Sequence, residues 1–242
     1  GTGLQPDQLH NAQTRISVRQ FSQACRNAIR AGAGPGTAFE VGSRMHISSY
    51  GMYGYALLCC ETLRDVARLA VRFHRLATPA LDMVFREEAT EAVWSYDRIV
   101  EAEVDDPLYR FLIEMQYAIH LTLGRDLVGP GFQLSRVLAR YPRPADIEVY
   151  HRYLGCPASF DQPTNELRYP STLLSAPTTY PNPLTVAMAS EICDRMLEEG
   201  QRDSGVAGRV FRLLMKVPGK FDDMETIAAR LNTTPRTLRR RL

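Results

Sequence analysis

Residues 221–242 constrain the fold more than any other part of this sequence, because helix caps stand at two points in this short span. Asp222 or Asp223 can cap a first helix by accepting a hydrogen bond from a backbone amide of its first turn. Thr234 followed by Pro235 supplies a cap and a first-turn proline for a second helix. The pattern therefore predicts two short helices separated by a tight turn.

Apolar residues in this segment indicate that the two helices pack against each other. Ile227 and Ala228 would form the inner face of the first helix, and the small Ala228 would let the second helix cross closely. Leu231 would fill the corner, while Leu238 and Leu242, at a spacing of four, would form the inner face of the second helix. This is the arrangement of a helix-turn-helix.

The opposite face of the second predicted helix is strongly basic. Arginines there can pair bidentately with guanine edges or contact phosphates when the helix lies in the major groove of DNA. An arginine run alone is more often a solvated helix end, but such an end does not need the caps and inner residues found here. The candidate DNA-contacting residues are Thr234, Arg236, Thr237, Arg239, Arg240 and Arg241.

The sequence IAARLNTTPRTLRRRL over residues 227–242 resembles the first helix-turn-helix of AraC-type bacterial transcription regulators. The family pattern is Leu-polar-x-Ser/Thr-Pro-Arg-Thr-Leu-x-Arg-x-Leu. By position, the resemblance turns four side chains toward the groove, namely Arg236, Thr237, Arg239 and Arg240. Residues 51–73, GMYGYALLCCETLRDVARLAVRF, resemble the arabinose-binding-like N-terminal domain of the subgroup that regulates amino-acid, carboxylate and lipid metabolism.

The resemblance implies a ligand-responsive transcription regulator whose N-terminal domain senses a small metabolite. Its implied partners are double-stranded DNA, a small-molecule effector and a second copy of the chain in a homodimer, and it leaves contact with RNA polymerase open. It implies no cofactor, no metal and no catalytic residue. The family carries two helix-turn-helix units, and this sequence stops after the first. We therefore expect a fragment that binds DNA weakly or not at all by itself.

Upstream of this segment, the apolar spacing predicts an α+β domain with helices packed on a mixed or antiparallel sheet. The predicted helices cover residues 17–31, 62–73, 106–124, 145–154 and 182–200. Gly124, Gly155 and Gly200 would end three of them. The predicted strands cover residues 81–86, 92–96, 132–141, 158–160 and 165–169. The order strand, helix, strand, strand in the second half, with a similar order over residues 45–96, suggests duplicated βαββ units.

Two stretches divide the chain. The proline-rich segment from Pro170 to Pro183 predicts an extended connector on the surface. The polar residues 201–208 mark a boundary between an effector-binding and dimerisation domain, 1–200, and a linker helix with the first helix-turn-helix, 201–242. The linker helix is indicated by Val206, Val210, Leu213, Leu214 and Val217.

Composition limits the class of protein. A net charge of +2 does not by itself identify a nucleic-acid binder, so DNA contact depends on local clustering of charge. Residues are 45% hydrophobic and 23% charged, which is ordinary for a soluble globular protein. The longest apolar run, near residues 53–60, is too short to cross a membrane. The cysteines lack zinc-site spacing and indicate buried thiols in a reducing cytoplasm: Cys25, Cys59, Cys60, Cys156 and Cys193.

An effector would occupy a concave, mostly apolar pocket with a few polar groups. Aromatic residues gather around two glycines at residues 46–55, Tyr55 among them, and on the predicted hairpin. The candidate ligand-binding residues are His46, Tyr50, Tyr53, Trp94, Tyr96 and Arg98. Arg98 or Arg136 could pair with a carboxylate effector. The alternative is that the aromatic residues belong to the core and the arginines are exposed charges.

Two other functional classes remain open. An enzyme could use His46, His74, His120 or His151, but the sequence has no GxSxG, HExxH, P-loop or dinucleotide-binding pattern. His120 and His151 also lie beside apolar stripes, which favours ordinary packing. A small-molecule-binding or dimerisation module without DNA binding is compatible with the helix over residues 182–199, which could pair across a two-fold axis.

Overall fold

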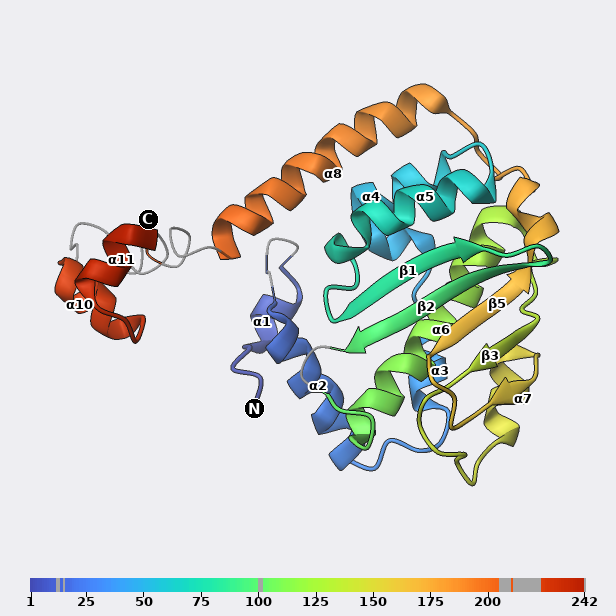
Figure 1. Cartoon of the computed structure of the whole chain (residues 1–242), viewed down its shortest axis with the longest axis horizontal. Coiled ribbons are helices and arrows are strands. Elements are labelled where there is room, and N and C mark those ends of the chain that lie inside the picture. The colour runs from blue at the N-terminus through green and yellow to red at the C-terminus, as the bar shows by residue number, and fades with distance from the viewer. Residues whose placement is uncertain (12–13, 15, 100–101, 205–209, 211–222, 242) are drawn as a thin grey trace. The chain divides into compact units, whose positions relative to one another are not determined.

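A mixed sheet of five strands, in the order β1-β2-β5-β3-β4, underlies the fold. The computed structural model describes residues 1–11, 14, 16–99, 102–204, 210 and 223–241. Two units are present, Gly1–Ser190 and Glu191–Leu242, and the sheet belongs to the first. Figure 1 shows the long helix over residues 107–128 passing behind the sheet. The strands are β1 Leu81–Glu87, β2 Glu91–Ile99, β3 Arg136–Leu138, β4 Ala158–Ser159 and β5 Glu166–Pro170.

Helices account for much of the remaining described chain. In the first unit they are α1 Pro6–Leu9, α2 Val18–Arg30, α3 Thr37–Ser43, α4 Gly51–Leu58, α5 Leu63–Phe73, α6 Pro107–Val128 and α7 Glu148–Leu154, with short 3-10 turns η1 Ile47–Tyr50, η2 His74–Leu76 and η3 Ser171–Ser175. Helix α8 covers Pro183–Ser204, and α10 Met224–Arg230 and α11 Pro235–Arg241 follow it. The predicted α+β class is confirmed. The sheet is mixed because β3 and β4 are parallel while the other pairs are antiparallel.

The predicted duplication is complete only in the second half, where β3, α7, β4 and β5 follow in the order strand, helix, strand, strand. The first half has α5, β1 and β2, and in place of a first strand it has an isolated bridge between Thr62 and Pro177. The strand predicted over residues 132–141 was too long. Only Arg136–Leu138 form it, because the chain turns at residues 130–131 and bends at 140–141.

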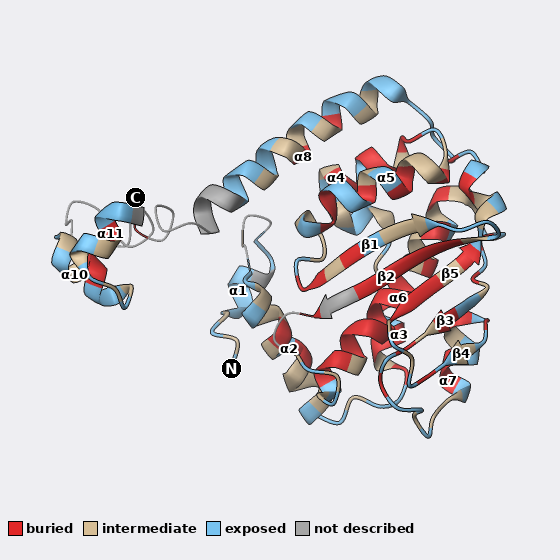
Figure 2. Cartoon of the chain, viewed as in Figure 1, coloured by how far each residue is buried: buried red, intermediate tan, exposed pale blue. Residues whose placement is uncertain are grey.

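Helix α6 is buried on nearly all sides and appears mostly red in Figure 2. Its start is as predicted, with Asp106 Oδ1 accepting a hydrogen bond from Leu108 N at 2.9 Å. The predicted end near Gly124 was wrong, since the helix continues to Val128. A Cβ at Gly124 would lie 2.3 Å from the Phe132 ring. Glycine there permits a close contact and does not break the helix.

Helix α3, which the sequence pattern did not reveal, packs closely against α6. A Cβ at Gly42 would lie 2.3 Å from the carbonyl oxygen of Met115 and 2.7 Å from Cβ of Ala118. The missing side chain therefore lets the two backbones approach. With 7 residues, α3 is too short to display a helical period clearly.

The predicted starts of α5 and α8 are confirmed, but the predicted end of α8 is not. Thr62 Oγ1 accepts a hydrogen bond from Asp65 N at 3.3 Å, and Asn182 Oδ1 accepts one from Thr185 N at 3.1 Å. Helix α8 continues through Gly200 to Ser204. No heavy atom would lie within 4 Å of a Cβ at Gly200, and a solvated helix tolerates glycine at about 1 kcal/mol relative to alanine. The boundary predicted at residue 200 therefore falls inside α8.

The proline-rich connector between β5 and α8 is partly buried, which corrects the expectation of a surface segment. Leu174 is 0% exposed and Thr178 is 5% exposed. The backbone amide of Thr178 donates to the carbonyl oxygen of Glu61 at 3.1 Å. The connector thereby holds the start of α5, even though its prolines keep most of it out of regular structure.

Charged side chains cover the sheet positions that alternate with its buried aromatic residues. Glu166 accepts hydrogen bonds from Arg86 at 2.8 Å and from Arg168 at 2.7 Å. Arg168 and Arg136 also pair with Glu91, at 2.9 and 2.6 Å. The Glu166 side chain is only 6% exposed. Burial alone would raise its pKa, but the hydrogen bonds from the two arginines hold the pKa of Glu166 below its ordinary value.

All five cysteines are buried free thiols, as predicted. Burial raises the pKa of Cys25 to about 11 and that of Cys60 to about 12, so these thiols stay protonated near neutral pH. Within the described ranges, no helix combines the length and hydrophobicity that crossing a bilayer would require.

We predict that Glu166→Gln lowers the free energy of unfolding at pH 7 by about 2–3 kcal/mol, because it leaves two guanidinium groups facing a neutral amide. The pKa of folded Glu166 is depressed, so its contribution is present above pH about 4.5 and is lost as the pH falls through the folded value. Urea denaturation at several pH values should show the difference from the parent shrinking below that pH. Glu88→Gln, at a side chain 41% exposed, is the control and should cost less than about 1 kcal/mol.

Candidate functional site

Helices α10 and α11 are joined by a tight turn in the second unit (Figure 1). Asp223 Oδ1 accepts a hydrogen bond from Thr226 N at 2.8 Å and caps α10. Thr234 Oγ1 accepts one from Thr237 N at 3.2 Å and caps α11. Asn232 in the turn has a φ of 50°, a left-handed conformation that asparagine tolerates. The alternative cap, Asp222, lies outside the described residues.

A small apolar core joins the two helices. Its buried members are Val210, Ile227, Ala228 and Leu238, with Met224 and Leu231 packed against them. Leu238 is 0% exposed. The predicted inner faces of both helices and the corner position of Leu231 are thus confirmed. Leu242 and the other predicted linker residues except Val210 lie outside the described residues.

The other face of α11 is exposed and basic. The side chains of Arg236, Arg239 and Arg240 are exposed, and within the described part of the chain none of them pairs with a carboxylate. The hydroxyl of Thr234 donates to that of Thr237 at 3.0 Å, which ties both to the helix start. Arg241 belongs to α11, but its side chain lies outside the described part. The six predicted DNA-contacting residues therefore share one short helix and its cap.

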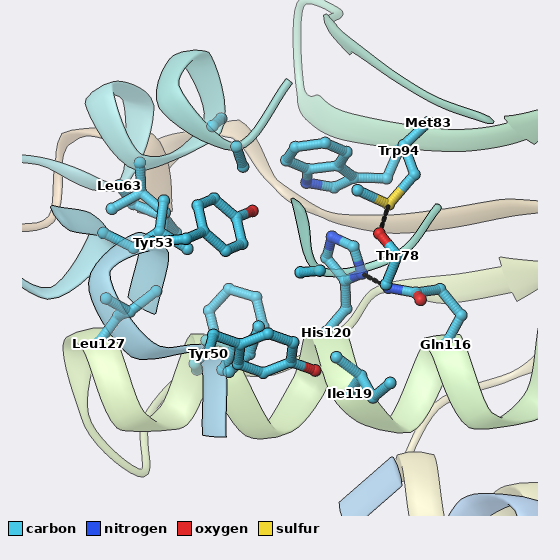
Figure 3. Close-up of a pocket in the computed structure, with 18 of the residues that line it drawn as sticks. Tyr50, Tyr53, Leu63, Thr78, Met83, Trp94, Gln116, Ile119, His120 and Leu127 are labelled. Atoms are coloured by element: carbon cyan, nitrogen blue, oxygen red, sulfur yellow. Dashed lines mark hydrogen bonds between the residues drawn. The ribbon is translucent and has the colours of Figure 1, made fainter. Parts of the chain in front are cut away.

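The first unit contains a mostly apolar cavity lined by residues of α4, α5, α6 and the sheet, which we call the inner cavity (Figure 3). Its volume is about 60 Å³. Its lining combines small alanines of α5 with larger side chains of α6 and β2. The lining residues include Tyr50, Tyr53, Ala67, Ala70, Met83, Trp94, Gln116 and His120.

A neutral histidine stands on the α6 side of this cavity. His120 Nδ1 lies within hydrogen-bond distance of Gln116 Nε2, at 3.0 Å, and of the Tyr96 hydroxyl, at 2.9 Å. Burial lowers the pKa of His120 to about 4, so the ring is uncharged at pH 7. Trp94 packs against it with ring centroids 4.9 Å apart.

Two buried polar atoms at the inner cavity have no hydrogen-bond partner among the described residues, Gln116 Oε1 and the Tyr50 hydroxyl. Gln116 is 2% exposed. Burial also raises the pKa of Tyr50 to about 12, so its hydroxyl keeps its proton. Figure 3 shows the phenol groups of Tyr50 and Tyr53 reaching toward the side on which His120 and Trp94 lie. An unpaired buried polar atom costs about 1–3 kcal/mol, which a bound molecule can offset.

A second, outer cavity of about 280 Å³ adjoins the first. The two cavities adjoin at five side chains that line both, Tyr50, Ala77, Thr78, Gln116 and Ile119. The outer cavity extends to α2 and α3, and its lining includes the exposed apolar side chains of Ile16 and Val41, 50% and 41% exposed. Within the described residues, no Asp, Glu, Lys or Arg lines either cavity.

Comparison with known families assigns this fold. Residues 1–178 match the family described as the arabinose-binding domain of AraC transcription regulators, N-terminal part. The chain belongs to the AraC family of transcription regulators. The family that the resemblance indicated is therefore confirmed, and residues 51–73 lie within the matched range. Residues 227–242 lie outside that range, and their role as a DNA-binding helix-turn-helix stays a prediction. As an AraC-family protein it contains the effector domain of a transcription regulator, and the proteins it resembles are regulators and not enzymes.

Relatives match almost the whole chain. The ornithine utilization regulator of Pseudomonas aeruginosa is 32% identical over 241 residues, which cover 99% of this chain and 70% of that protein. An uncharacterized HTH-type transcriptional regulator of Mycobacterium tuberculosis is 25% identical over 252 residues, 100% of this chain and 71% of that protein. The crystal structure of the transcriptional regulator CdpR from Pseudomonas aeruginosa has the same fold, with a TM-score of 0.61 at 21% identity over 98% of this chain and 76% of that one.

The AraC-family effector domain brings together three of the six predicted ligand-binding residues. Tyr50, Tyr53 and Trp94 line the inner cavity. Tyr96 is buried behind it and reaches it only through His120. His46 contacts Asp126 at 3.0 Å with its side chain 58% exposed.

The two predicted carboxylate partners lie elsewhere. Arg98 belongs to β2 and lies opposite Asp82 of β1. The side chain of Arg98 is outside the described part of the structure. Arg136 pairs with Glu91. Tyr55 is 50% exposed and does not join the aromatic group. The ligand-binding role of these residues stays a prediction.

Sequence reasoning missed Gln116 and placed His120 in ordinary packing. Both line the inner cavity. Their spacing of four puts them on one face of a helix that is otherwise apolar there, which is the signal that could have found them. Among the described residues, no group of three or more histidine, cysteine or acidic side chains could hold a metal ion.

We predict that Leu238→Ala unfolds the α10–α11 pair locally, because it empties the centre of a very small core and such truncations cost about 2–5 kcal/mol. Hydrogen–deuterium exchange read by mass spectrometry should show faster exchange in peptides from residues 223–241 and no change in the strands. Arg236→Ala, at an exposed position of the same helix, should leave the exchange of both regions unchanged. Equal effects of the two variants would contradict the assignment of the core.

Proposed function

We propose that this AraC-family chain is an effector-responsive regulator in which α11 contacts the major groove of double-stranded DNA. The observation that supports this is the division of one helix into a buried leucine face, at Leu238, and an exposed arginine face. Guanidinium groups of this kind bind guanine edges or phosphates. The proposed contacts are Thr234, Arg236, Thr237, Arg239, Arg240 and Arg241.

The proposal is tested by replacing arginines of α11 in the full-length protein. We predict that Arg239→Ala or Arg240→Ala weakens binding to a duplex from its own upstream region by about 1–3 kcal/mol if the side chain contacts a base. Fluorescence anisotropy at several salt concentrations measures this, and Arg152→Ala, an exposed arginine of α7, is the control.

Comparison of the loss of affinity on different DNA sequences distinguishes a contact to a base from a contact to a phosphate. A loss confined to the specific duplex indicates base contact, while an equal loss on all sequences with a smaller salt slope indicates phosphate contact. A parent protein with no sequence-selective, salt-dependent affinity would refute the proposal.

We further propose that the inner cavity is the effector site, with Tyr50, Tyr53 and Trp94 as contacts. The supporting observations are the mostly apolar lining and the two buried polar atoms without a partner among the described residues, which are features of small-molecule sites. His46 and Arg98 are not part of this proposed site. In this scheme residues 1–200 form the effector-binding and dimerisation domain, and residues 201–242 form a linker helix with the first helix-turn-helix.

Ornithine is not proposed as the effector, although one relative is named for ornithine utilization. A free amino acid carries charged groups at neutral pH, and buried charges require charged or multiple polar partners. In the described chain neither cavity supplies a charged side chain.

We propose that the chain forms a homodimer through α8. Apolar side chains follow at a spacing of four along it, at Leu184, Met188, Ile192 and Met196. Leu184 is 71% exposed, Met188 61% and Met196 43%. A second copy of the same helix can cover this stripe in a two-fold contact, which would place two reading helices on paired half-sites.

We predict that Met188→Glu shifts the protein from dimer to monomer, since it puts a charge in the centre of the proposed contact. Sedimentation velocity over a concentration series measures the shift, expected to be at least tenfold in the dissociation constant. Glu191→Gln, a neighbouring exposed position, is the control. A parent chain that remains monomeric at high concentration would rule out the α8 contact.

A further inference from the structure

The lining of the two cavities limits the chemistry of what they can bind. Gln116 and Tyr50 border both the inner and the outer cavity, and each carries a buried polar atom without a partner among the described residues. A folded protein rarely leaves two such buried atoms unpaired unless something else bonds to them. This juxtaposition is the basis of the inference, which rests on the proposed effector function and specifies its ligand.

We propose that the inner and outer cavities together bind an uncharged amphipathic molecule, with a polar end that both donates and accepts hydrogen bonds and an apolar body. The polar end lies against Gln116 and Tyr50. A primary amide or a hydroxyl group has the required chemistry.

The polar atoms determine the donor and acceptor pattern of that end. Gln116 Oε1 can only accept, so the ligand must donate to it. The Tyr50 hydroxyl retains its proton and can donate. A group that only accepts would leave Gln116 Oε1 unpaired, and a group that only donates would leave the Tyr50 hydroxyl without an acceptor.

The apolar lining excludes ionised groups at the buried end. Transfer of an ammonium or carboxylate from water into such a site is strongly unfavourable without a charged partner. The outer cavity, about 280 Å³ and bordered by Ile16 and Val41, can take the apolar body. The exposed apolar side chains at its rim remain in contact with water until such a body covers them.

Four probes with eight-carbon chains test the class directly: octanamide, octyl methyl ether, octanoate and octylammonium. Trp94 is the single tryptophan of the chain and lines the inner cavity, so its fluorescence reports occupancy. We expect octanamide to change the Trp94 emission saturably and to bind at least tenfold more tightly than either ion. The ether, which cannot donate to Gln116, should bind roughly three- to tenfold more weakly than the amide.

The Tyr50→Phe variant distinguishes an effect on ligand binding from an effect on folding stability. Removal of an unpartnered buried hydroxyl should leave the melting temperature unchanged or raise it, while octanamide binding weakens roughly three- to tenfold. Tyr55→Phe is the matched control, the same chemical change at a side chain 50% exposed on α4. It should alter neither quantity. A Tyr50→Phe protein that melts lower and binds octanamide normally would show that the hydroxyl is structural.

The outcomes distinguish this inference from the proposed function. Equal binding of all four probes, preference for an ion, or no saturable change with octanamide near its solubility limit overturns the ligand class, while DNA binding would be untouched. Loss of selective DNA binding in the full-length protein, with octanamide still bound at Trp94, would overturn the regulator proposal and leave the ligand class standing.

Discussion

Burial of α6 on nearly all sides is the constraint on which the first unit depends. This helix of 22 residues lies between the sheet and α3, so the polar groups on it must find partners inside the protein. Glu114 does so through Arg110 at 2.6 Å and the Tyr150 hydroxyl at 2.5 Å. Burial, partly offset by these partners, raises the pKa of Glu114. Gln116 and His120 bond to each other, and Gln116 Oε1 is left without a partner among the described residues.

Side-chain size determines where α6 packs closely against its neighbours and where a cavity remains beside it. Gly42 and Gly124 have no side chain where α3 and Phe132 press against α6, and the contact there is tight. At the inner cavity, α5 contributes the small side chains of Ala67 and Ala70, which fill less space than larger residues would. A closed core tolerates few such spaces because each one forfeits packing energy. The space in the inner cavity is one of the observations behind the proposed effector site.

Local chemistry predicted much of the architecture. Helix starts were predictable because a cap acts within three residues of its partner, as at Thr62, Asp106 and Thr234. The hairpin of β1 and β2 followed from alternation around an acidic turn. The α10–α11 pair followed from caps and apolar spacing inside one short segment, and Leu238 is buried as that spacing required. Each of these features depends on residues that are close in sequence, so it can be predicted from the sequence alone.

The amino-acid sequence by itself determined the family, the α+β class, most helix starts and the arginine face of α11, because each is encoded within a few turns of chain. Only the tertiary structure decided whether a given glycine ends a helix. Gly124 and Gly200 lie inside helices, because a glycine ends a helix only where the surrounding packing lets the chain turn. It also decided the cavity. Tyr50, Trp94 and Gln116 come from η1, β2 and α6, and only the fold brings such distant segments together around one space.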